Sequence, residues 1–135
     1  MKRSLIALCA GLILVFSGCS RTHVSMALNE SRVAPVGSAL FTEKNTHFGG
    51  GVNKVLVFAG STNNEIKLSQ AGQGWTATKW GSNYGQALQT ELTYPATCPQ
   101  EANYQGYKLR FDKVDSNGLV FTLLGVPSGV ETSNQ

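Results

Sequence analysis

The side chain with the most specific chemical potential is the thiol of Cys19, which directly follows an apolar segment. A cysteine at such a place can be a buried core residue, half of a disulfide, or the point at which a chain is cut and anchored. Lys2 and Arg3 precede the apolar run 4–16, and two small residues stand between that run and Cys19. This order of charge, apolar run and small residues is typical of a secretory signal. The run is shorter than the roughly 20 residues that a membrane-spanning helix needs.

The segment 16–19, Phe-Ser-Gly-Cys, resembles the lipobox of bacterial lipoproteins. In that family a diacylglyceryl group is attached to the cysteine, and the peptide is cut just before it. The resemblance implies that Cys19 becomes the lipidated first residue, although Phe16 stands where the family usually has Leu or Val. An Asp after the cysteine favours inner-membrane retention in Gram-negative lipoproteins, so Ser20 implies sorting to the outer membrane. Two or three acyl chains, palmitate among them, would anchor the protein essentially permanently, because each buried methylene contributes about 0.8 kcal/mol.

Removal of residues 1–18 would change the charge and the cysteine content of the protein. The whole chain has 135 residues and a formal net charge of +3, and loss of Lys2 and Arg3 lowers that charge to +1. A chain of this length is expected to form one domain, and so small a charge does not indicate a nucleic-acid surface. One of the three cysteines leaves with the signal and another carries lipid. Cys98 is therefore expected to be a small buried hydrophobe, with an intermolecular disulfide as the alternative.

The two histidines, His23 and His47, are the other side chains that could act in acid–base or metal chemistry. A metal site needs three or four ligands, and Glu43 with His47 supplies only two. Histidine-based catalysis needs a nucleophile and an orienting group, and no motif marks them. The glycines at 49–51 lack the Lys-Ser/Thr pair and the helix of a phosphate-binding loop, so they are interpreted as a flexible connector. We expect no catalytic residues, no metal, no cofactor and no enzymatic activity.

Trp75, Trp80 and Tyr84 form the most distinctive cluster of side chains, and four glycines lie near them. Exposed aromatic side chains beside glycines stack on sugars or pack against partner proteins. The alternative is that both tryptophans cap the core of a small β domain. Because Trp75 and Trp80 are five residues apart, they would face opposite sides of a regular strand, which leaves at least one exposed. The three aromatic residues are therefore candidate binding residues.

The elements that would position these residues are strands. Apolar runs and period-two alternation predict two hairpins, one joining 54–58 to 65–69 and the other joining 107–112 to 119–124. The second hairpin has a turn sequence at 115–118, where an Asp can bond forward to the backbone and a Gly can take positive φ.

Further strands are predicted at 36–42, around 75–80 and at 88–94. The glycine-containing segments 71–75 and 81–85 are expected to be breaks between them.

Six or seven short strands separated by turns predict an all-β fold, a single small antiparallel barrel or sandwich after an N-terminal signal helix. The expected organisation is a removed signal at 1–18, a lipidated tether at 19–34, a β domain at 35–125 and a flexible tail at 126–135. The inward positions of the predicted strands give the expected core: Leu40, Phe41, Leu56, Phe58, Ile66, Leu68, Leu92, Leu109, Phe111, Phe121 and Leu123.

The chain has a lipid-anchor motif followed by two hairpins in which apolar and polar residues alternate. This pattern also resembles that of small, uncharacterised β-rich lipoproteins of Gram-negative envelopes, and the resemblance implies no activity. We expect a non-enzymatic structural or interaction lipoprotein of the outer membrane, facing the periplasm or the cell surface. Its partners would be the membrane, through the lipid, and an envelope protein, with no nucleic acid. The alternative is a lipoprotein that binds a small ligand or glycan through the region 75–84. The sequence leaves the oligomeric state and the leaflet open.

Overall fold

The computed structural model describes residues 20–85 and 87–133, and every regular element in these residues is a β-strand. The all-β prediction is therefore confirmed, whereas Cys19 and the expected signal lie outside the described residues. The described strands are β1 (Ser20–Val24), β2 (Ser31–Ala34), β3 (Ala39–His47), β4 (Gly50–Ser61), β5 (Glu65–Thr78), β6 (Gly81–Tyr84), β7 (Leu88–Pro95), β8 (Gln100–Tyr104), β9 (Tyr107–Asp115), β10 (Gly118–Gly125) and β11 (Val130–Glu131).

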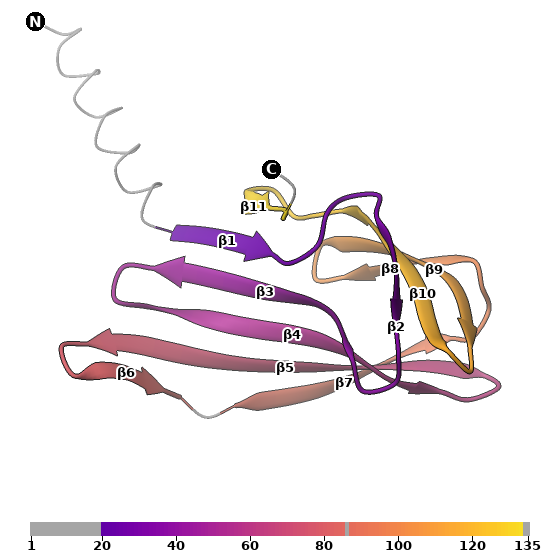
Figure 1. Cartoon of the computed structure of the whole chain (residues 1–135), viewed down its shortest axis with the longest axis horizontal. Coiled ribbons are helices and arrows are strands. Elements are labelled where there is room, and N and C mark those ends of the chain that lie inside the picture. The colour runs from indigo at the N-terminus through magenta and orange to yellow at the C-terminus, as the bar shows by residue number, and fades with distance from the viewer. Residues whose placement is uncertain (1–19, 86, 134–135) are drawn as a thin grey trace, which may run out of the picture.

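The strands form two sheets (Figure 1). The larger sheet has seven strands in the order β11-β1-β3-β4-β5-β6, and β7 also pairs with β5. The smaller sheet has four strands in the order β2-β10-β9-β8. Most neighbours are antiparallel, and β1 pairs with β11 in parallel. The long strand β5 therefore serves two partners, because β6 pairs with its end at Thr78 and β7 pairs with its start at Glu65.

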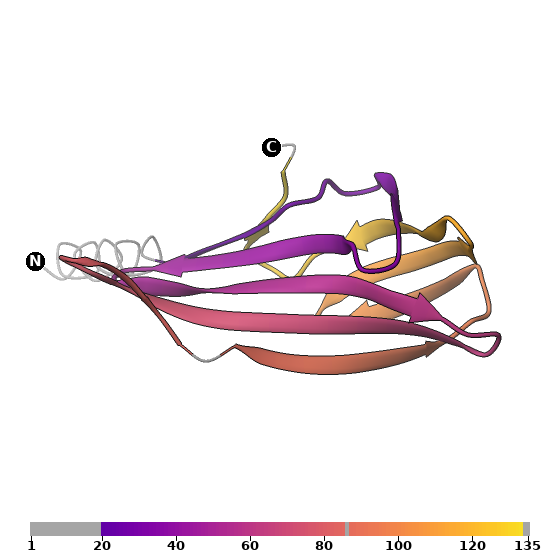
Figure 2. The same ribbon diagram turned by 60° about the horizontal axis from the view of Figure 1, so that its bottom comes forward.

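The two sheets pack face to face (Figure 2), and their facing side chains form the core. Of the two expected architectures the sandwich is correct, since the described strands make two open sheets and not a closed barrel. All expected core residues are buried except Leu92, which is partly buried against the core. The buried hydrophobic residues that the sequence did not assign to the core are Val24, Met26, Ala27, Ala34, Ala102, Tyr104, Tyr107 and Leu119.

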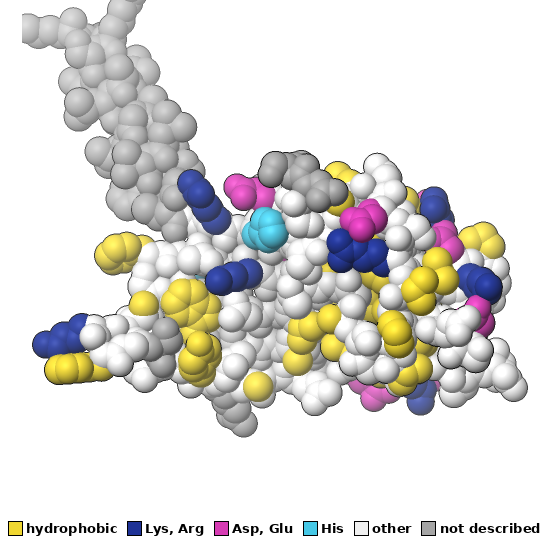
Figure 3. Space-filling view, in the orientation of Figure 1, with side chains coloured by type: hydrophobic (Ala, Val, Ile, Leu, Met, Phe, Trp, Pro, Cys, Tyr) yellow, Lys and Arg dark blue, Asp and Glu magenta, His cyan; other side chains and the backbone are white. Residues whose placement is uncertain are grey.

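The larger sheet extends beyond the smaller one at one end (Figures 1 and 2). Tyr107 of β9 marks the border of the covered region, because its hydroxyl donates a hydrogen bond to Glu43 of β3. Past this point the large sheet has no covering strand among the described residues. We call this part, residues 44–53 and 73–85, the overhang. Hydrophobic and basic side chains project from this end of the molecule (Figure 3).

The segment expected to be a tether is instead part of the fold. Residues 20–24 form β1 and pair with β3, and Ser31–Ala34 forms β2 in the smaller sheet. Val24 and Met26 are fully buried. The many polar residues of this segment favoured a tether. However, a strand with one buried face needs an apolar residue only at alternate positions, so a mostly polar segment can still form a strand.

The expected tail is also held by the fold. Val130–Glu131 forms β11 and pairs in parallel with Thr22 and His23 of β1. Thr132 is buried, and the amide of Ser133 donates to the carbonyl of Met26 at 3.3 Å. Residues close to the C-terminus therefore pack beside the start of β1.

The predicted strand boundaries around the glycines were wrong. The segment 71–75 is the middle of β5, where the glycines pair with β4, and 81–84 is the strand β6. By contrast, both predicted hairpins are confirmed, as β4–β5 and β9–β10. The turn of the second hairpin has the expected chemistry, because the amide of Asn117 donates to Asp115 Oδ1 at 2.8 Å.

Candidate functional site

Strand alternation divides the side chains of the large sheet between a covered face and an open face. Glu43 lies on the covered face, because Tyr107 of the smaller sheet reaches it. Its neighbours Thr42 and Lys44 therefore point to the opposite side, which we call the outer face. Strand pairing then puts Val55 and Ala71 beside Thr42 on that face, since Thr42 pairs with Val55 and Val55 pairs with Ala71.

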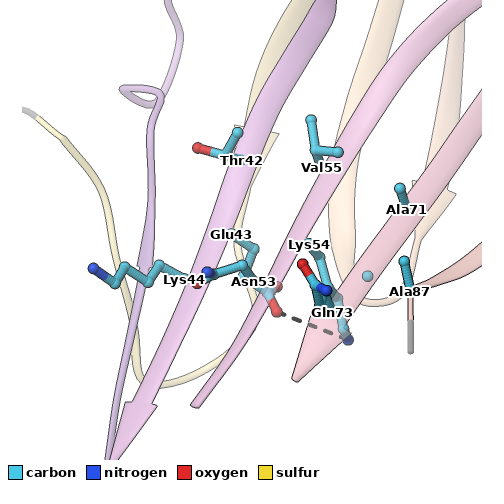
Figure 4. Close-up of a pocket in the computed structure, with 10 residues that line it drawn as sticks. Thr42, Glu43, Lys44, Asn53, Lys54, Val55, Ala71, Gln73 and Ala87 are labelled. Atoms are coloured by element: carbon cyan, nitrogen blue, oxygen red, sulfur yellow. Dashed lines mark ion pairs between the residues drawn. The ribbon is translucent and has the colours of Figure 1, made fainter. Parts of the chain in front are cut away.

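The outer face is hollowed in the middle of the sheet. A shallow pocket of about 440 Å³ is lined by Thr42, Glu43, Lys44, Asn53, Lys54, Val55, Ala71, Gly72, Gln73 and Ala87. Thr42, Val55 and Ala71 project side by side from three neighbouring strands (Figure 4). The wall is therefore a row of small side chains, bordered by the amides of Asn53 and Gln73. Such a surface offers apolar contact and both hydrogen-bond donors and acceptors to a binding partner.

The ionisable groups behind the pocket are engaged with one another. Lys54 Nζ lies 3.8 Å from Glu43 Oε1, as the dashed line in Figure 4 marks, and the Tyr107 hydroxyl donates to Glu43 Oε2. Burial, together with the hydrogen bond to Glu43, raises the pKa of Tyr107 above its ordinary value. Tyr107 therefore stays protonated and acts as a donor. Because both carboxylate oxygens are occupied, this cluster joins the two sheets and is not arranged as a general base.

The structure brings two of the three predicted aromatic residues together. Trp75 of β5 pairs directly with Tyr84 of β6, and both lie on the outer face of the overhang. Trp80 is separate from them, because it occupies the β5–β6 turn and is 88% exposed. The predicted alternation between Trp75 and Trp80 does not apply, since Trp80 lies beyond the end of the strand.

Trp75 is held in place by a glycine on the neighbouring strand. A Cβ atom at Gly51 would lie 2.9 Å from Trp75 Nε1, so the indole ring rests directly on the backbone of β4. In this position Nε1 is buried and has no hydrogen-bond partner among the described residues. An unsatisfied buried donor costs about 1–3 kcal/mol, so an acceptor supplied by a ligand or by water would stabilise it.

Several residues that the fold exposes carry no signal in the sequence. Phe48 is 95% exposed at the β3–β4 turn, although the sequence suggested only a flexible connector there. No sequence motif for binding includes the pocket residues Thr42, Asn53 and Gln73. The register of β3, β4 and β5 places these residues side by side. This register could not be predicted, because the break expected at 71–75 divides the segment that forms β5.

The remaining candidates for chemistry are dispersed. Within residues 20–85 and 87–133, no group of three His, Cys, Asp or Glu side chains could hold a metal ion. His23 lies in β1, and His47 ends β3 with Nδ1 3.2 Å from the carbonyl oxygen of Phe48. Cys98 is partly buried against the core, where burial and then the charge of Asp112 raise the pKa of its thiol. A raised thiol pKa lowers reactivity, in agreement with a packing role.

Comparison with known proteins gives no match: no family model, no curated protein and no solved structure resembles this chain. Among the described residues there is also no helix long and apolar enough to cross a membrane.

Proposed function

We propose that this protein is an outer-membrane lipoprotein of the cell envelope, anchored through Cys19, that acts as a non-enzymatic interaction module. Support for the anchor comes from the lipobox-like segment 16–19 and the apolar run before it. We further propose that the outer face of the large sheet is the surface that receives an envelope protein. The observation that carries this second proposal is the uncovered pocket on that face, with Trp75 and Tyr84 beside it.

A protein partner suits this surface for physical reasons. Within residues 20–85 and 87–133, Tyr84 is a large aromatic residue exposed on the outer face itself, where it pairs with the partly buried Trp75. Exposed aromatic side chains that carry a polar atom are enriched at interaction surfaces. Tyrosine and tryptophan are also the residues that contribute most often to the energetic centre of protein interfaces.

In-cell photocross-linking tests the proposed surface. A photoreactive amino acid replaces Asn53 on the outer face in one strain and Lys113, an exposed residue of β9 on the smaller sheet, in the other. We expect a discrete cross-linked product of higher mass from the Asn53 position, which mass spectrometry would identify as an envelope protein. The Lys113 position should give no such product. Equal products from both positions, or none from Asn53, would show that the outer face is not the contact surface.

The anchor has its own test. Cells that are fed a labelled fatty acid should incorporate the label into the wild-type protein and not into Cys19→Ser. Incorporation into Cys19→Ser would contradict the assignment of the lipidated residue.

Glycan binding is a second candidate function, favoured by the unpartnered indole N–H of Trp75 and the neighbouring ring of Tyr84. Sugars are bound by aromatic rings together with amide and hydroxyl groups, and Gln73 and Asn53 supply amides close by. Titration of intrinsic tryptophan fluorescence with peptidoglycan fragments separates this candidate from the first. A saturable change that Trp75→Phe abolishes would favour a glycan, and no change would favour a protein partner.

A further inference from the structure

We propose that the tips of the overhang, which are the β3–β4 turn and the β5–β6 turn, rest in the headgroup region of the membrane that holds the anchor. This inference rests on the lipid anchor proposed above and adds a second, noncovalent contact with the same bilayer. Four observations support it: the start of β1 at Ser20, the exposure of the tips, their charge and their reach.

The first observation is that β1, the first strand among the described residues, begins at Ser20, one residue after Cys19. Ser20 pairs with His47, the residue just before the β3–β4 turn. Paired Cα atoms in an antiparallel ladder lie about 4.5–5.5 Å apart, and consecutive Cα atoms are about 3.8 Å apart. The Cα atom of Phe48 therefore lies within about 9 Å of that of Ser20. A lipid on Cys19 would thus place this end of the sheet, and no other, against the membrane.

The second observation is that each tip presents an aromatic side chain that nothing in the described chain covers. Phe48 is 95% exposed and Trp80 is 88% exposed. The ammonium group of Lys79 lies 5.0 Å from the centre of the Trp80 ring. Tryptophan beside lysine suits the boundary between lipid tails and water, because the ring enters the apolar side while the charge meets the headgroups.

The third observation is the charge of this end. Lys44 of β3, Lys79 of the β5–β6 turn and Arg21 of β1 are exposed there. The stretches 44–64 and 66–90 contain no Asp or Glu. Basic side chains near a bilayer surface are attracted to anionic lipids, each by about 1 kcal/mol.

The fourth observation is that the two turns differ in reach. Gly50, which pairs with His47, also pairs with Thr76, and β5 then continues to Thr78 before the turn that holds Trp80. The β5–β6 turn therefore extends about two residues, or about 7 Å, further than the β3–β4 turn. Trp80 is consequently expected to sit deeper in the bilayer than Phe48.

Quenching of tryptophan fluorescence by brominated lipids tests the contact. The lipidated protein, purified from cells, is reconstituted into vesicles of phosphatidylcholine and phosphatidylglycerol that carry bromine near the headgroup end of the acyl chains. Trp75→Phe leaves Trp80 as the sole reporter. In the Trp75→Phe/Trp80→Phe background, Phe48→Trp reports on the other tip and Asn63→Trp reports on the β4–β5 turn at the opposite end of β4. All three reporters occupy exposed turns, so each is expected to fold.

We expect quenching of Trp80 to exceed that of the Asn63→Trp reporter at least about threefold, with Phe48→Trp intermediate, because only the tips reach headgroup depth. Equal or absent quenching at both ends, in protein that carries the fatty-acid label, would overturn the membrane contact and leave the anchor standing. Absence of the label from the wild-type protein would instead refute the anchor. Strong quenching of Trp80 in such unlabelled protein would then support the tip contact on its own.

Discussion

At the scale of single residues, Glu43 is the polar side chain that connects the two sheets. It meets Lys54 of its own sheet and the hydroxyl group of Tyr107 of the other. Tyr107 in turn packs in an aromatic group with Phe41 and Tyr104. The border between covered and uncovered sheet is therefore defined by tyrosines whose hydroxyl groups must remain protonated.

This arrangement predicts a loss of stability at alkaline pH. Burial, with a smaller contribution from Glu43, raises the pKa of Tyr104 from 10.0 to about 12, and the pKa of Tyr107 is also raised. Above pH 10 the unfolded chain releases these protons while the folded protein retains them. The contribution of these two tyrosines to the free energy of unfolding should therefore be constant below this range and be lost as the pH rises from 10 towards 12.

Urea denaturation at several pH values measures this loss. In Tyr104→Phe the free energy of unfolding should fall less steeply above pH 10 than in the wild type. Tyr84→Phe serves as the control, because Tyr84 is 64% exposed and lies outside the aromatic group. Equal slopes for the wild type and Tyr104→Phe would contradict the prediction.

At the scale of elements, the segment before β3 is the main difference between expectation and structure. Met26 lies between β1 and β2 and is fully buried, whereas Leu28, two residues later, is 39% exposed. If the segment belongs to the fold, Met26→Ala should lower the free energy of unfolding by about 2–5 kcal/mol through loss of packing. Leu28→Ala should cost less than about 1 kcal/mol. Urea denaturation of both variants makes the comparison, and similar small losses would restore the interpretation as a tether.

Local patterns explain which elements could be predicted. The β9–β10 hairpin has strict alternation and a turn with an Asp and a Gly, so both its strands and its turn are encoded locally. The β8–β9 hairpin was missed because its turn is Gln105-Gly106, with φ values of 48° and 88°, and Gln is a weak signal for such a turn. The glycines of β5 predict a break, but strand pairing holds them extended: Gly72 pairs with β4 and β7, and Gly74 pairs with β4.

The candidate site was less predictable than the core. Burial depends on alternation within one strand, which a sequence displays, and this is why nearly all expected core positions are correct. The pocket depends on the order of β3, β4 and β5 and on their register, which a single strand does not contain. The aromatic residues could be identified from the sequence. Their arrangement follows from the length of β5: Trp75 lies within the strand and pairs with Tyr84, whereas Trp80 lies in the turn after the strand ends.

At the scale of the whole molecule, the sandwich is asymmetric along its length. One end contains the core between two sheets, and the other is a single uncovered layer (Figure 2). Amides in a single layer can exchange through local opening, whereas amides in the sandwiched core exchange only with global unfolding. We therefore expect faster hydrogen exchange in residues 73–78 of β5 than in residues 65–70 of the same strand.

Hydrogen exchange followed by mass spectrometry resolves these two halves of one strand. Because both segments belong to β5, a difference in their exchange rates cannot come from a comparison between different strands. Uniform protection along β5 would mean that the overhang unfolds only together with the core, and the predicted gradient would be wrong.

The parallel pairing of β1 with β11 also limits the order in which the chain can fold. Thr22 pairs with Val130, so the ladder joins positions near opposite ends of the described chain. Contacts over such a sequence distance close late, because the entropy of a long loop must be lost before they form. During synthesis, β1 can pair with β3 as soon as β3 has emerged, but its other edge stays open until Val130 and Glu131 have been made. The large sheet is therefore complete only after residues 130–131 have left the ribosome and reached β1.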